Sequence, residues 1–234
     1  MRRWTYLVGN QELIDVFEKG GSVHLLIASI IHPEMWKLYP GEKFKKEYAA
    51  TWYQWVKNGN FSIIYGATRN KADLTYKCPG AYDLIARRFP EVPEFTTNCI
   101  QEVWNNFAWY HAPFVEVDGG YRLEVPLDDI FKAVNYKIQG GAGWMMIEAM
   151  IEISSCPEYL NSGAQIINQV HDSLTIELPR KALSQKVVEG IREAMEAPGY
   201  KYMPTSAASC DIITHYDEPE FIFDENNQLV EVPF

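Results

Sequence analysis

The most regular pattern of apolar and polar positions lies around His171-Asp172. Alternate positions on either side of this pair form two sets: Ile166, Asn168 and Val170, which would share one face, come before it, and Leu174, Ile176 and Leu178 come after it. Alternation with a period of two is typical of strands, so the pattern predicts a β-hairpin with His171 and Asp172 at its tip. A carboxylate on a rigid turn can hold a divalent metal ion. Taken alone, the segment fits equally well with Asp172 as an ordinary turn-forming residue.

Helical periodicity dominates the N-terminal half. Apolar positions predict helix from Asn10 to Ile31, broken at Gly20-Gly21, capped again by Ser22 and ended by His32-Pro33. A basic segment follows. The stretch from Glu42 to Ile64 then predicts one long helix, because no glycine or proline interrupts it before Gly59.

Helices also account for most of the remaining chain, with one more hairpin. We expect short helices over residues 69–100, helices over Phe95–Tyr110, Leu127–Ile153 and Lys181–Ala197, and a hairpin over residues 114–125. The acidic tail from Asp211 predicts a short strand at Ile212-Ile213 and irregular structure after it. The whole pattern predicts an α+β fold.

One helical stripe carries chemistry. Tyr53, Lys57, Phe61 and Tyr65 recur every four residues, so they share one helix face. A lysine between aromatic rings can hold a phosphate while the rings stack on a base or sugar. In isolation, an aromatic core stripe with a lysine that extends to the surface is the more common arrangement.

A second helical segment combines amides with glycines. Asn135 and Gln139 lie four residues apart and precede Gly140-Gly141 and Gly143. Amides at this spacing can hydrogen-bond a groove edge or a sugar, and the glycines would allow close approach of a backbone or a nucleic acid. The pattern is not a dinucleotide-binding fingerprint, because no strand precedes it.

Composition narrows the class of protein. The 234 residues carry a formal net charge of −10, which argues against a general nucleic-acid-coating protein but allows a local basic groove. The four cysteines form no C-x-x-C pair, so we expect reduced thiols in a cytoplasmic protein. The longest apolar run, Leu25–Ile31, is too short to span a bilayer, so no membrane partner is expected.

Three of these segments, in order, resemble the polymerase module of family A DNA polymerases, the bacterial DNA polymerase I group and its phage relatives. Lys57–Gly66 resembles the fingers-helix motif K-x-x-N-F-x-x-x-Y-G, Asn135–Gly140 resembles N-x-x-x-Q-G, and Gln169–Asp172 resembles the palm motif Q-V-H-D-E. The resemblance spans most of the chain. It implies a helical, fingers-like region over residues 1–110 and a partial palm with a small antiparallel sheet over residues 111–234.

The resemblance also implies roles in nucleotidyl transfer. Asp172 would be one of two aspartates that bind two Mg²⁺ ions, and His171 would contact the primer terminus. Lys57 would hold the triphosphate of the incoming dNTP, Phe61 would stack near its sugar, and His24 would touch the triphosphate.

The DNA primer-template would be the second ligand. The resemblance implies that Tyr65 guards the templating position. It also implies that Asn135 and Gln139 face the minor groove of the duplex, where hydrogen-bond acceptors occur at every base pair.

The chain departs from the family pattern at several positions. The other metal-binding aspartate lies in a D-x-S-Q-x-E segment upstream of a Leu-Arg pair, on which Met1-Arg2 falls here. Tyr53 stands in place of a triphosphate-binding arginine, Phe131 in place of another arginine, and Ser173 in place of the palm glutamate. One carboxylate neutralises too little charge to hold two divalent ions close together.

We therefore expect the C-terminal subunit or fragment of a split polymerase, poor or inactive as an isolated chain. A second polymerase chain would supply the missing aspartate motif together with thumb or exonuclease-like parts. A split phage gene would place both chains in the cytoplasm of a bacterial host. The open edge of the Gln169–Asp172 hairpin would suit pairing with such a chain.

Two alternatives belong to other classes. A degenerate, non-catalytic nucleic-acid-binding or replication-assembly protein would explain the replaced arginines and the absent aspartate. A metal-dependent hydrolase built on Asp172 and His171 has less support, because the sequence holds no ligand cluster such as H-E-x-x-H.

Overall fold

The computed structural model describes residues 1–203, 207–213, 221–224 and 228–231. The chain divides into two compact units, Met1–Trp144 and Met145–Phe234. The division falls inside the helix α10 (Ala133–Ser155). The boundary predicted at residue 110 divides a fingers-like region from a partial palm. That functional division stays a prediction. The fold class is α+β, as predicted, with many helices and small antiparallel sheets.

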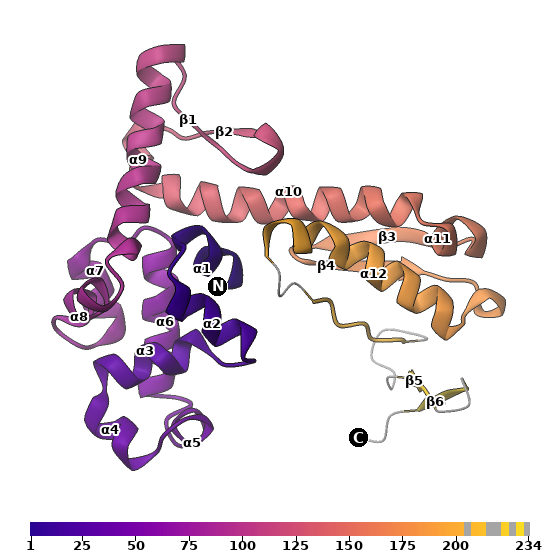
Figure 1. Ribbon diagram of the computed structural model, residues 1–234, viewed down its shortest axis with the longest axis horizontal. Helices are drawn as coiled ribbons and strands as arrows, with labels where there is room; N and C mark the ends of the chain where they lie inside the picture. Colours follow the sequence, from indigo (N-terminus) through magenta and orange to yellow (C-terminus); the bar gives the residue numbers. More distant parts are fainter. Residues whose placement is uncertain (204–206, 214–220, 225–227, 232–234) are drawn as a thin grey trace. The chain divides into compact units, whose positions relative to one another are not determined.

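Unit 1 begins with nine α-helices (Figure 1). They are α1 (Arg2–Val8), α2 (Gln11–Glu18), α3 (Val23–Ile31), α4 (Pro33–Leu38), α5 (Glu42–Glu47), α6 (Trp52–Ile64), α7 (Arg69–Tyr76), α8 (Ala81–Arg88) and α9 (Glu91–Tyr110). After α9 come the strands β1 (Phe114–Glu116) and β2 (Arg122–Glu124), the short 3₁₀ helices η1 (Asp118–Gly120) and η2 (Leu127–Lys132), and the start of α10.

The predicted break in the first long helical segment is confirmed. The Asn10 side chain caps α2 by accepting a hydrogen bond from the Leu13 backbone N–H at 3.1 Å. Gly20 adopts φ 70°, which is easily reached only by glycine, and ends that helix before α3 begins. Pro33 then occupies the first turn of α4, where its missing N–H costs nothing.

The single helix predicted from Glu42 to Ile64 is wrong, because two helices, α5 and α6, meet at a turn over residues 48–51. Phe44 and Val56 are both fully buried. In one straight helix these two positions would point about 120° apart, so one face could not bury both. The turn resolves this conflict, and the backbone N–H of Thr51 donates to the Tyr48 carbonyl at 3.0 Å within it.

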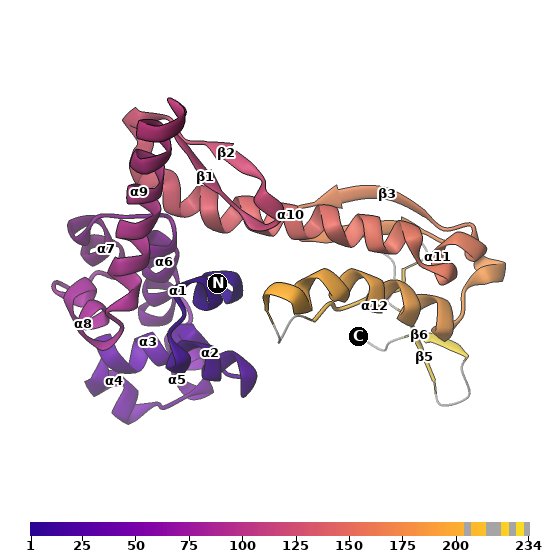
Figure 2. The same cartoon turned by 45° about the horizontal axis from the view of Figure 1, so that its top comes forward.

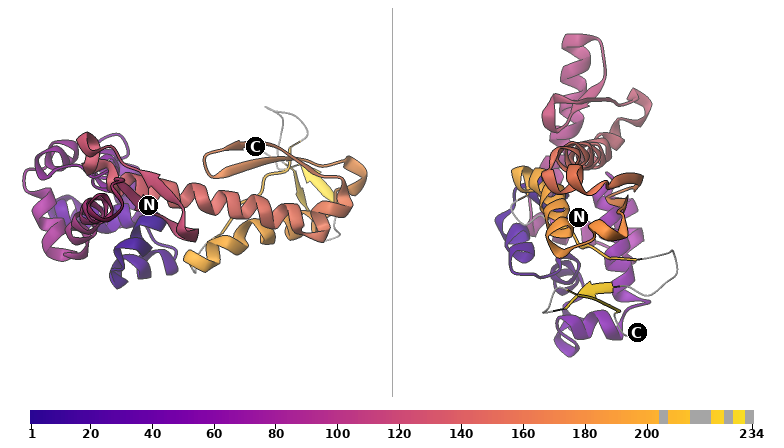
Figure 3. Two further views of the ribbon diagram at one scale, coloured as in Figure 1. Left: turned by 90° about the horizontal axis from the view of Figure 1, so that it is seen from above. Right: turned by 90° about the vertical axis from the view of Figure 1, so that its right-hand side faces the viewer.

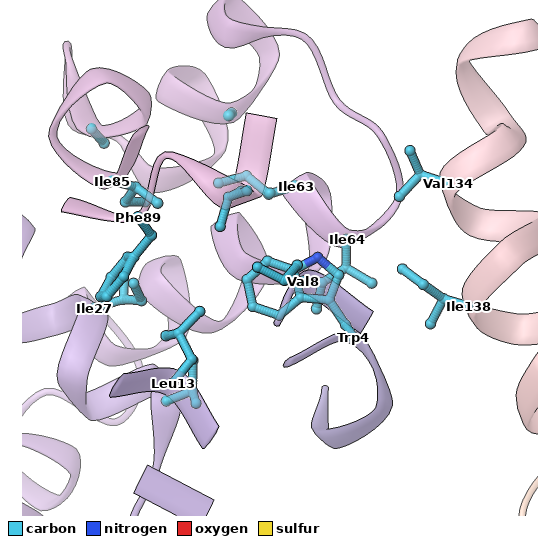
Figure 4. Packing of buried hydrophobic residues seen from close by; sticks show 14 of the residues in the cluster. Trp4, Val8, Leu13, Ile27, Ile63, Ile64, Ile85, Phe89, Val134 and Ile138 are labelled. Atoms are coloured by element: carbon cyan, nitrogen blue, oxygen red, sulfur yellow. The ribbon is translucent and has the colours of Figure 1, made fainter. Parts of the chain in front are cut away.

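The core of unit 1 forms around α3 and α6. Helix α3 contacts α6 and α8, and α6 packs against α7. Trp4 and Val8 of α1, Ile64 of α6 and Ile138 of α10 belong to one buried cluster (Figure 4). Burying each such side chain contributes roughly 1.5–3 kcal/mol, so this cluster fixes α6 in place.

The predicted hairpin over residues 114–125 is confirmed as the β1–β2 pair. The turn end of β1 is held by Lys137 of α10, whose ammonium donates to the Glu116 carbonyl and pairs with Glu102 of α9 at 2.8 Å. Its turn is held by Asp118, which forms an ion pair with the buried Arg3 of α1. The hairpin therefore joins three helices of unit 1.

Unit 2 contains the end of α10, then α11 (Pro157–Ser162), the strands β3 (Gln165–Val170) and β4 (Ser173–Glu177), the 3₁₀ helix η3 (Arg180–Ala182), and α12 (Gln185–Tyr202). Helix α12 runs alongside the end of α10 (Figure 2), and Lys201 pairs with Glu148 at 3.1 Å. The helix predicted over Lys181–Ala197 begins later and runs through Pro198, because Ser184 caps it by accepting from the Val187 N–H.

The tail differs in part from its prediction. Ile212 forms only an isolated bridge with Phe221, and the strands β5 (Phe221–Phe223) and β6 (Leu229–Glu231) pair where irregular structure was expected. Residues 204–206, 214–220, 225–227 and 232–234 lie outside the described part of the chain.

The hairpin predicted around His171-Asp172 is confirmed as the β3–β4 pair (Figure 3), but the faces of β3 differ from the prediction. A β-bulge between Ile166 and Asn168 leaves Ile167 as an extra residue in β3. Ile166 therefore shares a face with Gln169, and the prediction that Asn168 and Val170 lie on the face of Ile166 is wrong. Strict alternation fails here because a bulge inserts one unpaired residue.

Candidate functional site

One face of α6 carries the predicted stripe. Tyr53, Lys57 and Phe61 recur along the helix, and Tyr65 follows as its C-cap. The rings of Phe61 and Tyr65 stack with centroids 6.3 Å apart and planes 17° apart. Lys57 is exposed, and no carboxylate in the described part of the chain lies within ion-pair distance of its ammonium. The face therefore presents an unneutralised cation beside stacked rings.

His24 of α3 lies against the same face. Its ring is 6.3 Å from the Tyr53 ring and 5.6 Å from the Phe61 ring, centroid to centroid. Burial and the nearby positive charge of Lys57 lower the pKa of His24 from 6.5 to about 4. At neutral pH the imidazole is therefore uncharged, and the stripe and His24 form one cluster within unit 1.

Two further residues complete this cluster. Neither of them was assigned a role from the sequence. Asn60 lies in the quoted motif, and its amide Nδ2 is 2.8 Å from His24 Nδ1. Tyr76 of α7 donates its hydroxyl to Asn60 Oδ1 at 2.6 Å. The motif letter could have drawn attention to Asn60, whereas no periodic pattern marks Tyr76.

The tip of the β3–β4 hairpin carries His171 and Asp172 in unit 2. His171 adopts the left-handed backbone conformation with φ 52°, which histidine tolerates better than most residues. The Gln169 side-chain amide donates to the His171 carbonyl at 2.7 Å, and the Ser173 hydroxyl donates to the Val170 carbonyl at 2.9 Å. These bonds fix the turn, while the side chains of His171 and Asp172 stay exposed.

The donor chemistry of Asp172 fits Mg²⁺, which prefers carboxylate oxygens. Its carboxylate makes no hydrogen bond or ion pair within the described ranges and is therefore open to a ligand. No group of three or more His, Cys, Asp or Glu side chains suited to a metal occurs among those residues. Asp172 can thus serve as one ligand, but the described residues do not form a complete two-ion site.

The amide pair lies on α10. Gln139 is exposed, and Asn135 is half-buried with its side-chain oxygen lacking a hydrogen-bond partner in the described structure. A buried acceptor of this kind is usually satisfied by water or a ligand. Contact of these two residues with a DNA minor groove stays a prediction.

The adjacent glycines serve a purpose other than the one expected. A Cβ at Gly140 would meet the Leu123 side chain at 1.9 Å, and one at Gly141 would meet Arg3 at the same distance. These glycines therefore make room for side chains of unit 1. Gly143 alone of the three has nothing within 4 Å and stays open to an approaching molecule.

Comparisons with known proteins identify the family of the chain. The family model described as DNA polymerase family A matches residues 1–207. The chain belongs to DNA polymerase family A. Its ordered motifs thus agree with a match that covers both units.

Relatives in this family come from several bacteria. The chain is 29% identical over 215 residues to the thermostable DNA polymerase I of Thermus thermophilus, with 82% of this chain and 24% of that protein covered. It is 22% identical over 214 residues to DNA polymerase I of Lactococcus lactis, with 84% and 22% covered. The chain therefore spans about a quarter of the length of the curated relatives it matches.

A solved structure shows the same fold. The POL domain of Pol1 from M. smegmatis, in complex with DNA primer-template and dNTP, aligns with a TM-score of 0.67 and 20% identity. The alignment covers 84% of this chain and 35% of that one. No helix in the described ranges has the length and apolar character needed to cross a bilayer.

The structure shows the neighbours of two residues that depart from the family A pattern, Tyr53 and Phe131. Tyr53 packs its ring edge-on against His24, so this position supplies aromatic contact rather than positive charge. Phe131 is exposed, and its backbone carbonyl abuts Gly66, where a Cβ would lie 2.4 Å from the oxygen. Gly66 thus lets the end of α6 pack directly on η2.

Proposed function

We propose that this family A chain supplies the nucleotide-binding face and one metal-ligand carboxylate for template-directed DNA synthesis. Its ligands would be a DNA primer-template, a dNTP and two Mg²⁺ ions. The observation that carries this proposal is the cluster in unit 1, where the unpaired ammonium of Lys57 extends from the face that holds Phe61 and an uncharged His24. A triphosphate and its sugar match these groups in charge and in shape.

Lys57 would hold the triphosphate electrostatically. Phosphoryl transfer depends mostly on positioning and on stabilising negative charge, since little covalent chemistry is required of the protein. The Lys57 ammonium would face more negative charge as the bond to the leaving phosphate breaks. Phe61 would stack near the sugar, and Tyr65, which is 45% exposed and stacked on Phe61, would cover the templating position.

In unit 2, Asp172 would be a Mg²⁺ ligand and His171 would contact the primer terminus. When bound, the two Mg²⁺ ions would supply positive charge at the attacking and leaving oxygens. The fixed turn of the β3–β4 hairpin would hold the Asp172 carboxylate for this task. Asn135 and Gln139 would contact the minor groove of the duplex.

A second carboxylate, from a D-x-S-Q-x-E segment, would complete the two-ion site. The β3–β4 sheet has two strands, so each strand keeps one edge that pairs with no described strand. Ile167 and Val170 on β3 are 53% and 51% exposed, and such an edge favours pairing with another chain.

Primer extension with purified components tests the proposal. The full chain, alone and mixed with a polypeptide carrying the D-x-S-Q-x-E segment, receives primer-template, dNTP and Mg²⁺. We expect extension from the mixture, its loss by several orders of magnitude with Asp172→Ala, and little change with Asp211→Ala, an exposed aspartate of the same unit. Normal extension with Asp172→Ala would remove Asp172 from the metal site.

A non-catalytic DNA-binding or replication-assembly protein is the second candidate. It is favoured by Tyr53, which presents a ring where the family pattern has an arginine, and by the single unpaired carboxylate at the hairpin tip. This function predicts DNA binding without Mg²⁺-dependent extension in any mixture. The same assay therefore separates the two candidates.

A further inference from the structure

A chain of two hydrogen bonds leads from α7 through α6 to His24. The Tyr76 hydroxyl donates to Asn60 Oδ1 at 2.6 Å, and Asn60 Nδ2 lies 2.8 Å from His24 Nδ1. An amide NH₂ can only donate, so His24 Nδ1 must accept. In an uncharged imidazole the proton then resides on Nε2.

The position of Tyr76 is set by packing. Its side chain is fully buried, and its ring lies so close to Gly59 that a Cβ there would be 2.2 Å from Tyr76 Cδ1. Burial raises the pKa of Tyr76 well above its usual value, so the phenol keeps its proton. Because Gly59 has no Cβ, the Tyr76 ring can pack against it, and the Tyr76 hydroxyl then reaches the side-chain oxygen of Asn60.

We propose that Asn60 and Tyr76 are positioning residues that hold His24 in its Nε2–H tautomer, so that it donates a hydrogen bond to a triphosphate oxygen. This inference rests on the proposed function, in which His24 touches the triphosphate of a dNTP. It adds two residues that do not themselves contact the nucleotide. It also fixes which atom of His24 makes the contact.

The arrangement suits an anionic ligand held next to a lysine. A protonated His24 would be repelled by Lys57, whereas the uncharged ring adds a directed donor without a second cation. The rings of Tyr53 and Phe61 lie beside the imidazole and limit its rotation. Because Tyr76 occupies the Asn60 oxygen, the amide cannot turn that oxygen toward His24 without losing the phenol as a donor.

Nitrogen-15 NMR of the histidine side chains in the full chain tests the tautomer directly. We expect Nε2 protonation in the wild type, with the His24 signals assigned by their loss in His24→Gln. Asn60→Asp replaces the donor with a carboxylate, which would accept from the ring, so protonation should move to Nδ1. Wild-type His24 protonated on Nδ1 would overturn the inference.

Binding of dATP with Mg²⁺ tests the consequence. Tyr76→Phe keeps the ring beside Gly59 but removes the hydroxyl, and we expect mixed tautomers and an affinity weaker by about fivefold. Tyr82→Phe, a partly buried tyrosine outside this chain of bonds, should change neither. Equal dATP affinity and an unchanged tautomer in Tyr76→Phe would overturn the role of Tyr76.

These measurements distinguish a failure of the proposed function from a failure of the tautomer assignment. A wild-type chain that binds no dATP contradicts the proposed function and the triphosphate as the acceptor. The NMR spectra still decide, without nucleotide, whether Asn60 and Tyr76 set the tautomer. A purely structural role for Tyr76 would lower the melting temperature of Tyr76→Phe while leaving the His24 nitrogen shifts as in the wild type.

Discussion

The ammonium of Lys137 lies 2.8 Å from one carboxylate oxygen of Glu102 and 3.0 Å from the other, which joins α10 to α9. Both side chains are about three-quarters buried, and Glu102 also accepts the Glu116 backbone N–H at 2.7 Å. Glu102→Gln would leave the Lys137 charge without its counter-ion. We expect it to lower the free energy of unfolding by about 1–3 kcal/mol in urea titrations. Glu94→Gln, an exposed change on the same helix, should have little effect.

The contact between Gly59 and Tyr76 gives a second prediction. Gly59→Ala should destabilise the chain by about 1–3 kcal/mol, because the added methyl group would overlap the buried ring. Gly143 is a matched helical glycine with open space around it. Gly143→Ala should instead stabilise α10 by about 0.5–1 kcal/mol. Thermal unfolding of both variants checks the pair, and equal effects would contradict the packing at Gly59.

Lys57→Ala should reduce kcat/KM for dNTP roughly 10- to 100-fold in the assembled polymerase, through both a higher KM and a lower kcat. The reason is that the ammonium would interact more strongly with the transition state than with the ground state. Steady-state primer extension measures both constants. Lys71→Ala removes an exposed lysine from α7 and serves as the control. Unchanged kinetics for Lys57→Ala would make it an ordinary surface lysine.

Acid should destabilise the fold through His32. This side chain is buried beside Trp52, with ring centroids 4.5 Å apart, and burial lowers its pKa from 6.5 to about 4. The unfolded state therefore binds more protons between these two values. Stability is fully present above pH 6.5 and falls as the pH drops toward 4, and His24 contributes with the same sign.

Urea unfolding at pH 7 and pH 4.5 measures this loss. We expect roughly 1–2 kcal/mol from each of the two histidines, less than the full shift would give because pH 4.5 lies above the folded-state pKa of about 4. His32→Gln should remove its share of the acid-induced loss. His111→Asn, at an exposed position, should leave the pH dependence unchanged.

Local patterns predicted the elements well, because they depend on neighbouring residues. The hairpin around His171-Asp172 and the break at Gly20-Gly21 both correspond to observed structure. The break between α5 and α6 escaped prediction, because Ala49-Ala50 favour helix and only the burial of Phe44 and Val56 requires a turn.

Within the candidate site, only residues that the family resemblance implies could be predicted from the sequence. The stripe on α6 and its contact with His24 agree with the motif, but Tyr76 enters the cluster through packing against Gly59. A contact between α6 and α7 depends on three-dimensional approach, which periodicity does not encode. The same holds for Gly140 and Gly141, whose purpose appears only once Leu123 and Arg3 are placed.

The extra residue at Ile167 has a consequence for comparing related hairpins. In a hairpin of the same length without the bulge, continuous pairing from Val170 would place Ile167 rather than Ile166 opposite Ile176, and Ile166 would lie on the other face. Two proteins that share the letters Q-V-H-D would then differ in which side chains of the first strand lie on each face before the motif. Alignments of such hairpins should therefore match the length of the strand before the motif as well as its letters.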